Sequence, residues 1–288
     1  MGATRNVSDV SLQPILVLLS QSAGGNPSQY MVEKSFERHQ LDWRYLTVEV
    51  AAEAIGDAVR GIRAMGFLGG NCARPHNRLA GRFLDRLGPV AERSGSVNVI
   101  LRDEGRLVGE NTEGKGMLKS IEACRGAPPQ RVLLFGAGDL ARAAACELAD
   151  AGVELIVVVN RDATRAQALC EMLGERPGLS ARVSPWEESI QLPEGFDVLI
   201  NATPVGSQPD NGRLPFDWES LATGATAVDA NLQDTRPRLL VEASERGLSL
   251  VNGLDIFLEQ AVLNFRLWTG LEPERTVMRE SVEEFLEL

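Results

Sequence analysis

The sequence predicts an α/β protein built on largely parallel sheets. Short apolar runs, typical of buried strands, alternate along the chain with segments whose apolar residues recur at helical spacing. Near the middle of the chain, a glycine-rich turn joins one such strand to a helix. The chain has 288 residues, which is enough for two domains of ordinary size.

The first half of the chain is expected to open with a loose leader over residues 1–10. The elements expected after it are a strand at 14–19, a helix at 28–40, a strand at 43–48, a helix at 51–65, a turn at 69–71 into another strand, a helix at 79–93, and a hairpin of 96–102 with 106–110. The hairpin is predicted to turn at Glu104-Gly105.

The second half begins after residues 126–130, where Pro128 and Pro129 suit a boundary or a linker. The elements expected there are strands at 131–135, 154–160, 197–202 and 225–230, and helices at 141–151, 163–173, 255–268 and 273–288. The helix at 255–268 is amphipathic and is expected to return to the first half of the protein.

Charge and composition exclude several classes of partner. The net charge is -11, so nucleic acid and anionic membranes would be repelled. The apolar stretch at 15–19 is too short for a signal or a membrane span. With four scattered cysteines, no CxxC pair and two histidines, we expect no metal site and a cytoplasmic location. The cysteines are Cys72, Cys124, Cys146 and Cys170.

The glycine-rich turn has the residues that a dinucleotide diphosphate needs. Gly136 and Gly138 allow a tight turn and a close approach of the diphosphate to backbone N–H groups at a helix N-terminus. Ala141 occupies the third position of the fingerprint, as an accepted variant. The strand before the turn, the helix after it and the second strand give the context that such a motif requires. The alternative is a glycine-rich turn that binds nothing.

The end of the second strand carries both residue types that distinguish the two nicotinamide cofactors. Arg161 and Arg165 could clamp a ribose 2′-phosphate, whereas Asp162 could accept a hydrogen bond from a free 2′-hydroxyl. We favour NADP, with NAD as the alternative. Arg165 taken alone could equally be a solvated charge on the face of a helix.

Taken together, these and four further motifs resemble the shikimate dehydrogenase family. The segments that carry the resemblance are Ser96-Val97-Asn98, residues 107–114, Gly136-Ala137-Gly138 with Arg142-Ala143, Asn160-Arg161, residues 201–206, and Asn252-Gly253 through Gln260, Ala261 and Phe265 to residues 268–270. They occur in the order in which the family has them and span residues 14 to 270.

The resemblance implies an N-terminal α/β substrate domain and a Rossmann-type domain, with ligands in the cleft between them. The substrate domain would comprise residues 1–112, completed by the helices of 254–288, and the cofactor domain residues 113–253. The cofactor would be held by Gly136, Ala137, Gly138, Asp139, Leu140, Asn160, Arg161, Arg165, Asn201, Thr203 and Gly253. The positions facing the substrate would be Ser28, Ala73, Asn98, Asn111, Leu232 and Gln260. The family also implies a monomer or homodimer and a role in aromatic amino acid biosynthesis.

The catalytic positions depart from the family. Its members use a Lys paired with an Asp to supply the proton when hydride reaches a ring ketone. Here the Lys position holds Asn77, and the Asp position holds Glu113, which is one methylene longer. An amide can hydrogen-bond a substrate oxygen but is no useful acid near neutral pH. His76 or Lys115 could replace the missing acid, and each could equally be an ordinary surface or supporting residue.

The substrate positions change as well. Ala73 replaces a binding Thr and Leu232 replaces a Tyr. In place of the family's N-terminal Ser-x-Ser-Pro, only Ser28, or Ser28 together with Asn26, could stand in. The first hypothesis is therefore an NADP-dependent oxidoreductase that transfers hydride to or from a shikimate-type cyclic hydroxy-acid, with an altered substrate or weak activity. The alternative is a non-catalytic nucleotide-binding or regulatory homologue. A third reading is a scaffold with no ligand.

Overall fold

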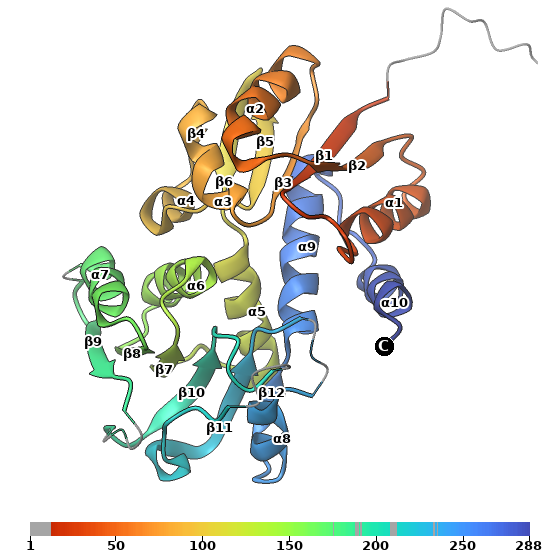
Figure 1. Cartoon of the computed structure of the whole chain (residues 1–288). Coiled ribbons are helices and arrows are strands. Elements are labelled where there is room, and N and C mark those ends of the chain that lie inside the picture. Colours follow the sequence, from red (N-terminus) through yellow and green to blue (C-terminus); the bar gives the residue numbers. More distant parts are fainter. Residues whose placement is uncertain are drawn as a thin grey trace, which may run out of the picture.

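The computed structural model describes residues 13–174, 176–187, 190, 192–207, 212–232, 234 and 236–288, and these form an α/β protein with two six-stranded sheets (Figure 1). The predicted fold class is confirmed. The leader expected at 1–10 lies outside the described residues. No helix in the described part of the chain is both long and apolar enough to cross a membrane.

The N-terminal sheet is mixed and has the strand order β2-β1-β3-β5-β6-β4. Its strands are β1 (Ile15–Ser20), β2 (Arg44–Glu49), β3 (Gly69–Cys72), β4 (Arg86–Leu87), β5 (Val99–Asp103) and β6 (Arg106–Glu110). β1 pairs in parallel with β2 and β3, while β5 pairs antiparallel with β3 and β6. The helices α1 (Ser28–Arg38) and α2 (Ile55–Ala64) join these strands, so the expected alternation and the hairpin are confirmed.

Two predictions in this half were wrong. The expected turn at 69–71 is strand β3 itself, because Gly69 and Gly70 let it pass close to its neighbours: a Cβ on Gly70 would lie 1.8 Å from the carbonyl oxygen of Val17. The expected helix at 79–93 is broken into α3 (His76–Leu79), a 3-10 turn, β4 and α4 (Pro89–Ser94). Pro89 has no N–H to continue a helix and instead begins a new one.

The C-terminal sheet is wholly parallel, in the order β12-β11-β10-β7-β8-β9. Its strands are β7 (Arg131–Phe135), β8 (Leu155–Asn160), β9 (Ser180–Pro185), β10 (Phe196–Asn201), β11 (Leu221–Asp229) and β12 (Ser249–Val251). The associated helices are α6 (Asp139–Asp150), α7 (Ala163–Leu173) and α8 (Arg238–Ser244). The sequence had predicted four of these strands and the helices α6 and α7, but it missed β9, β12 and α8.

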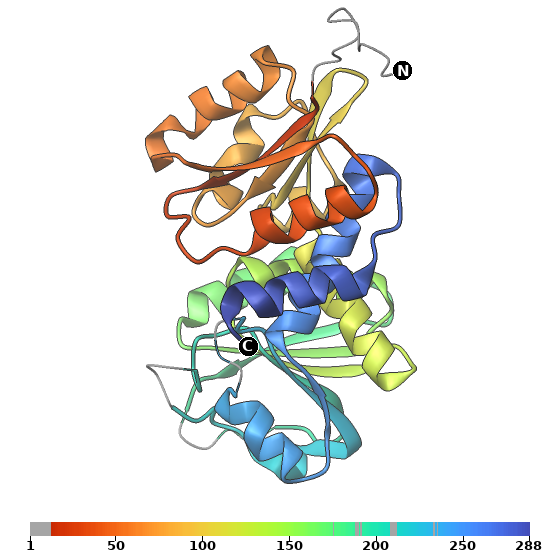
Figure 2. The same cartoon turned by 90° about the vertical axis from the view of Figure 1, so that its right-hand side faces the viewer.

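Two helices connect the two halves, and the last helix of the chain packs on the N-terminal half. α5 (Glu113–Arg125), which the sequence did not predict, packs against α6 and against α9 (Gly253–Thr269). Glycines permit this contact, since a Cβ on Gly114 would lie 2.3 Å from the carbonyl oxygen of Ala143. α10 (Arg275–Leu286) runs beside α1, as Figure 2 shows, so the end of the chain completes the N-terminal half.

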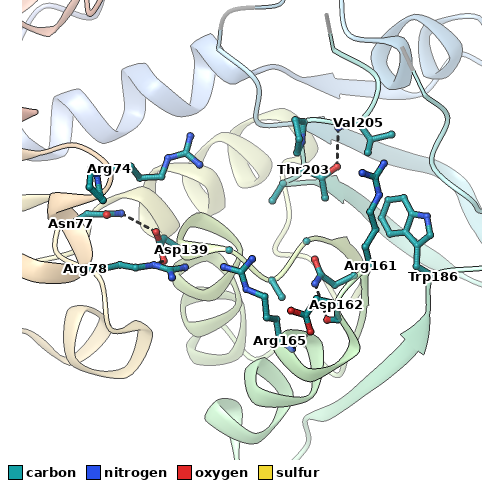
Figure 3. A pocket seen from close by; sticks show the side chains of 17 residues that line it. Arg74, Asn77, Arg78, Asp139, Arg161, Asp162, Arg165, Trp186, Thr203 and Val205 are labelled. Carbon is teal, nitrogen blue, oxygen red and sulfur yellow. Dashed lines mark hydrogen bonds and ion pairs between the residues drawn. The ribbon is translucent and has the colours of Figure 1, made fainter. Parts of the chain in front are cut away.

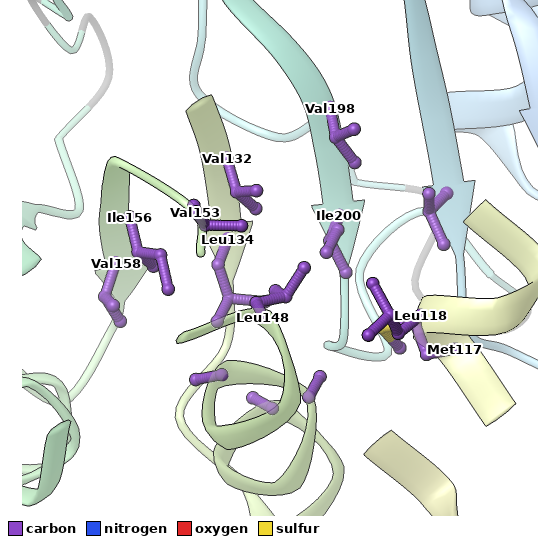
Figure 4. Close-up of a cluster of buried hydrophobic side chains, with 14 of the residues drawn as sticks. Met117, Leu118, Val132, Leu134, Leu148, Val153, Ile156, Val158, Val198 and Ile200 are labelled. Carbon is purple, nitrogen blue, oxygen red and sulfur yellow. The ribbon is translucent and has the colours of Figure 1, made fainter. Parts of the chain in front are cut away.

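The core of the C-terminal half holds the strands of its sheet in register, so the turns that follow them lie at one edge of the sheet. Val132, Leu134, Ile156, Val158 and Ile200 project from β7, β8 and β10 onto one face and are fully buried (Figure 4). α6 and α5 cover this face and contribute Leu148, Met117 and Leu118. Because the strands are held in register, the turns that follow β7, β8 and β10 emerge together at their carboxyl ends, where open α/β sheets bind ligands.

Candidate active site

A cavity of about 530 Å³ opens at this edge of the C-terminal sheet (Figure 3). The turn of Gly136, Ala137 and Gly138 forms its floor and leads into α6. Gly136 has a φ of +116°, and a Cβ there would lie 2.9 Å from the carbonyl oxygen of Ala202. The turn is therefore shaped for glycine, and its size and open backbone fit a dinucleotide.

At the far end of this cavity stand the residues expected to recognise the ribose. Asn160, Arg161, Asp162 and Arg165 all line it. Oδ1 of Asp162 accepts a hydrogen bond of 3.1 Å from the backbone N–H of Arg165, so this carboxylate caps α7. The carboxylate therefore has a structural task of its own, and the two arginines line the place where a ribose phosphate would lie.

Trp186 forms a further part of this wall, although nothing in the sequence pointed to it. It follows β9, and the guanidinium of Arg161 lies over its ring at 5.1 Å from the centroid. Its ring also meets Phe135 edge-on, with the centroids 5.6 Å apart. Its role could not be inferred because the strand that positions it is only half-buried and lacks a clear alternation.

On the opposite side, the turn after β10 is shaped by Asn201, which is fully buried. Its Nδ2 donates to Asp229 at 2.8 Å and to the carbonyl of Val205 at 2.9 Å, while its Oδ1 accepts from the N–H of Thr203 at 3.0 Å. Asn201 therefore does not face the cavity as expected. It holds the turn that places Thr203, Pro204 and Val205 on the wall.

A second cavity of about 320 Å³ lies between the N-terminal sheet and α9. Of the expected substrate positions, Ser28, Ala73, Asn98, Leu232 and Gln260 line it. Two of the expected cofactor residues lie here rather than in the first cavity, namely Leu140 and Gly253. Gly253 sits against the backbone of Asn231, since a Cβ there would be 2.4 Å from its carbonyl oxygen.

The expected residues Asn98 and Asn111 hold the backbone beside Glu113. Oδ1 of Asn98 accepts from the N–H of Thr112 at 2.8 Å, and its Nδ2 donates to the Thr112 hydroxyl at 2.9 Å. Oδ1 of Asn111 accepts from the N–H of Glu113 at 3.0 Å, and its Nδ2 donates to the carbonyl of Ser96 at 3.0 Å. Asn111 is buried and lines neither cavity, so the structure does not bring it to the substrate.

Glu113 lies where the two cavities meet. It lines the second cavity and a smaller one of about 270 Å³ that reaches the cofactor turn at Gly138 and Asp139. Its Oε2 is buried and has no hydrogen-bond partner among the described residues. Burial raises the pKa of Glu113 to about 7 and the Asp139 carboxylate adds to the rise, while Arg74 and a hydrogen bond with Asn111 oppose it. Such a group can both give and take a proton near neutral pH.

Asn77, at the position of the family's Lys, joins the two halves. Its Nδ2 donates to the hydroxyl of Ser96 at 3.1 Å and to Oδ2 of Asp139 at 3.2 Å. Arg78 completes the link by an ion pair with Asp139 (Figure 3). Asn77 faces the cofactor cavity and the junction at Glu113, but not the second cavity.

Neither of the substitute acids reaches the cleft. His76 is fully buried, and its Nε2 lies 2.8 Å from the carbonyl oxygen of Val50. His76 begins α3 and, unlike Asn77, lines none of the three cavities of the cleft. Lys115 points toward α6 and forms an ion pair with Glu147 at 3.4 Å. The expectation that either could supply the proton is therefore corrected.

Comparisons with known proteins agree with this architecture. Models described as "Shikimate dehydrogenase substrate binding domain", "Shikimate / quinate 5-dehydrogenase" and "Shikimate 5'-dehydrogenase C-terminal domain" match residues 22–100, 122–208 and 253–283. A shikimate dehydrogenase (NADP(+)) of Bacillus cereus (strain AH187) is 34% identical over 268 residues, which cover 90% of this chain and 95% of the relative.

Two solved structures are similar over nearly the whole chain. The ligand-free 5-ketofructose reductase of Gluconobacter sp. strain CHM43 is 33% identical with a TM-score of 0.89, covering 95% of this chain and 99% of that one. Shikimate 5-dehydrogenase from Thermus thermophilus, in complex with NADP(H) and shikimate, is 32% identical with a TM-score of 0.82, covering 95% of this chain and 100% of that one.

Proposed function

The chain belongs to the shikimate dehydrogenase family, and from that premise we propose that it interconverts a small polyhydroxylated ketone and its secondary alcohol, with Glu113 as the acid–base residue. It is an NADP-dependent oxidoreductase, as its relatives are. The observation that supports the acid–base role is the position of Glu113, between the two cavities and with a pKa raised to about 7.

NADP fits the first cavity, and when bound it supplies or accepts the hydride. The turn at Gly136–Gly138 leaves backbone N–H groups open to the diphosphate. Arg161 and Arg165 face the place of the ribose phosphate, and Trp186 offers an aromatic wall beside them. Thr203 lines both this cavity and the smaller one that reaches Glu113.

Glu113 performs the proton transfer in this proposal. As hydride reaches the carbonyl carbon, the π-electron pair moves to the oxygen, and the protonated Glu113 carboxyl donates a proton to it. In the opposite direction the carboxylate removes the hydroxyl proton. With a pKa of about 7, both forms of Glu113 are populated near neutral pH, so one residue serves either direction. Asn98, Asn111 and Thr112 fix its place by holding the backbone at the start of α5.

The substrate is of shikimate size but is held by fewer polar groups. The second cavity combines Ala73, Leu232 and other apolar groups with the polar side chains of Ser28 and Gln260. Each hydroxyl without a partner would lose about 1–3 kcal/mol of binding discrimination. We therefore favour a shikimate-type hydroxy-acid with a different hydroxyl pattern. A second candidate is a ketosugar, because the 5-ketofructose reductase is similar over 95% of this chain.

We further propose a cytoplasmic location, a monomer or homodimer, and a division into residues 1–112 with 254–288, and 113–253. The unpaired cysteines and the acidic charge support the location. The start of α5 at Glu113 supports the division. The non-catalytic alternative is not favoured, because both cavities and a titratable group between them are present.

The test follows NADPH absorbance with 3-dehydroshikimate, 3-dehydroquinate and 5-ketofructose as separate substrates. We expect one of them to be reduced, and Glu113→Gln to lower kcat by about 10²–10⁴-fold with little change in the NADPH KM. Glu92→Gln is the matched control, because Glu92 is exposed on α4. A Glu113→Gln variant that keeps the natural rate would refute the acid–base role.

A further inference from the structure

Arg74 occupies the only position among the described residues that lines all three cavities of the cleft. It follows β3 and precedes Pro75, and it borders the cofactor cavity, the substrate cavity and the junction that holds Glu113. In Figure 3 its side chain extends from the Asn77 side of the pocket toward Thr203. Its guanidinium therefore reaches the space in which a substrate and a nicotinamide would meet.

The charge on Arg74 is not committed to another part of the protein. Its neighbour Arg78 is paired with Asp139, and the guanidinium of Arg161, on the far wall of the cofactor cavity, lies over the ring of Trp186. Arg74, by contrast, makes no hydrogen bond or ion pair with any residue that the structure describes. An arginine with five donors that faces a cleft and has no partner in the described part of the chain is available to a ligand.

The reaction needs a positive charge at this place. Hydride arrival leaves negative charge on the substrate oxygen, and a donor fixed beforehand at that oxygen lowers the barrier. The family's Lys would carry such a charge, but Asn77 is neutral and its Nδ2 is already shared between Ser96 and Asp139. Arg74 stands three residues earlier, on the same turn, and its charge already acts on Glu113.

We propose that Arg74 is a catalytic residue whose guanidinium hydrogen-bonds the substrate oxygen that exchanges a proton with Glu113. This inference rests on the proposed function. During reduction the new O–H bond forms with the proton of the Glu113 carboxyl, and Arg74 keeps all its protons. The resulting carboxylate faces the guanidinium until solvent returns a proton to it. The positive charge that the family places at position 77 is thus supplied in this chain by Arg74.

The test compares Arg74→Gln and Arg74→Lys with Arg82→Gln, an exposed arginine on the 3-10 turn Ala80–Phe83 that lines none of the three cavities. With the ketone that the natural protein reduces, Arg74→Gln is expected to lower kcat by about 10²–10³-fold. The Lys variant should recover part of this loss, and Arg82→Gln should lose none. The dissociation constant of NADPH, followed by its fluorescence, should stay the same.

A second measurement needs no turnover. The titration of the Glu113 carboxyl, followed by ¹³C NMR in the free protein, should move to higher pH in Arg74→Gln, because Arg74 lowers that pKa while Asp139 raises it. An unchanged titration together with an unchanged kcat would overturn the proposal. A loss confined to NADPH affinity would also overturn it and make Arg74 a phosphate contact. If Glu113→Gln keeps its rate, the proposed function fails; if only Arg74→Gln keeps it, this inference alone fails.

Discussion

Removing the carboxyl of Glu113 should make the protein more stable at alkaline pH while it removes activity. Glu113 is buried where its charged form is disfavoured, so its pKa is about 7 in the folded state against an ordinary value near 4.5. At about 1.4 kcal/mol per pKa unit, this difference amounts to at most about 3.5 kcal/mol. The carboxylate remains in contact with the cleft, so we expect about 2 kcal/mol in practice.

The sign follows from proton linkage. Below pH 4.5 the carboxyl is protonated in both the folded and the unfolded state, so it does not change the free energy of unfolding. Between 4.5 and about 7 the folded state binds more protons than the unfolded state, so the contribution of Glu113 to stability falls as pH rises and is lowest above 7. The Glu113→Gln variant has no carboxyl to titrate at this position, so its stability does not fall in this way as pH rises. Its free energy of unfolding, relative to that of the natural protein, should therefore rise by about 2 kcal/mol from about pH 4.5 to about pH 8.

The assay is urea unfolding of both proteins at about pH 4.5, 6 and 8, with Glu92→Gln as the control for removal of an exposed carboxylate. The control should follow the natural protein at every pH. Gln has a different hydrogen-bonding capacity from Glu, so a constant offset between the two proteins is allowed. A difference that does not change with pH would refute the reasoning, because it would show that Glu113 titrates alike in the folded and unfolded chain.

Three further predictions concern other parts of the site. Asn77→Lys should lower an existing turnover at least about tenfold, since a Lys beside Asp139 would bring a second cation to Glu113 and favour its charged form; a rise by orders of magnitude in the NADPH assay would instead mark the natural protein as a degraded enzyme. Arg165→Gln should raise the KM for NADPH about tenfold while leaving that for NADH unchanged, and equal effects on both would exclude contact with the 2′-phosphate. Gly114→Ala should destabilise the protein by about 1–3 kcal/mol in urea unfolding, because its Cβ would lie 2.3 Å from the Ala143 carbonyl oxygen; an unchanged midpoint would contradict the tight contact of α5 with α6.

The parts of the structure that the sequence predicted well depend on local signals. The turn at Gly136 and the helix of 163–173 were found because a glycine pattern and an apolar period act over a few residues. The same reasoning failed at β3, where Gly70 serves a close approach to Val17, and the sequence does not show what the chain approaches. Strand β9 was not predicted because its residues are half-exposed and show no alternation between buried and exposed positions.

The sequence predicted which segments surround the site, but not which side chains face the cavities. Motif residues such as Asn111 and Asn201 were expected to touch ligands, yet their amides are used to hold neighbouring backbone. A motif shows that a residue type is needed, but not which of its atoms face the cavity. Arg74 and Trp186 were missed because their importance arises only when segments distant in sequence meet around the cleft.

The attachment of α5 has a consequence for how this family acquires new substrates. Its first residue is Glu113, while Met117, Leu118 and Ile121 anchor it in the core beneath the cofactor turn. Two of the pocket residues at which this chain departs from the family, Ala73 and Leu232, lie on other elements. Mutations at these two positions can therefore reshape the pocket while Glu113 keeps its place beside the cofactor turn. A pocket wall that can change without moving α5 allows one scaffold to take different substrates.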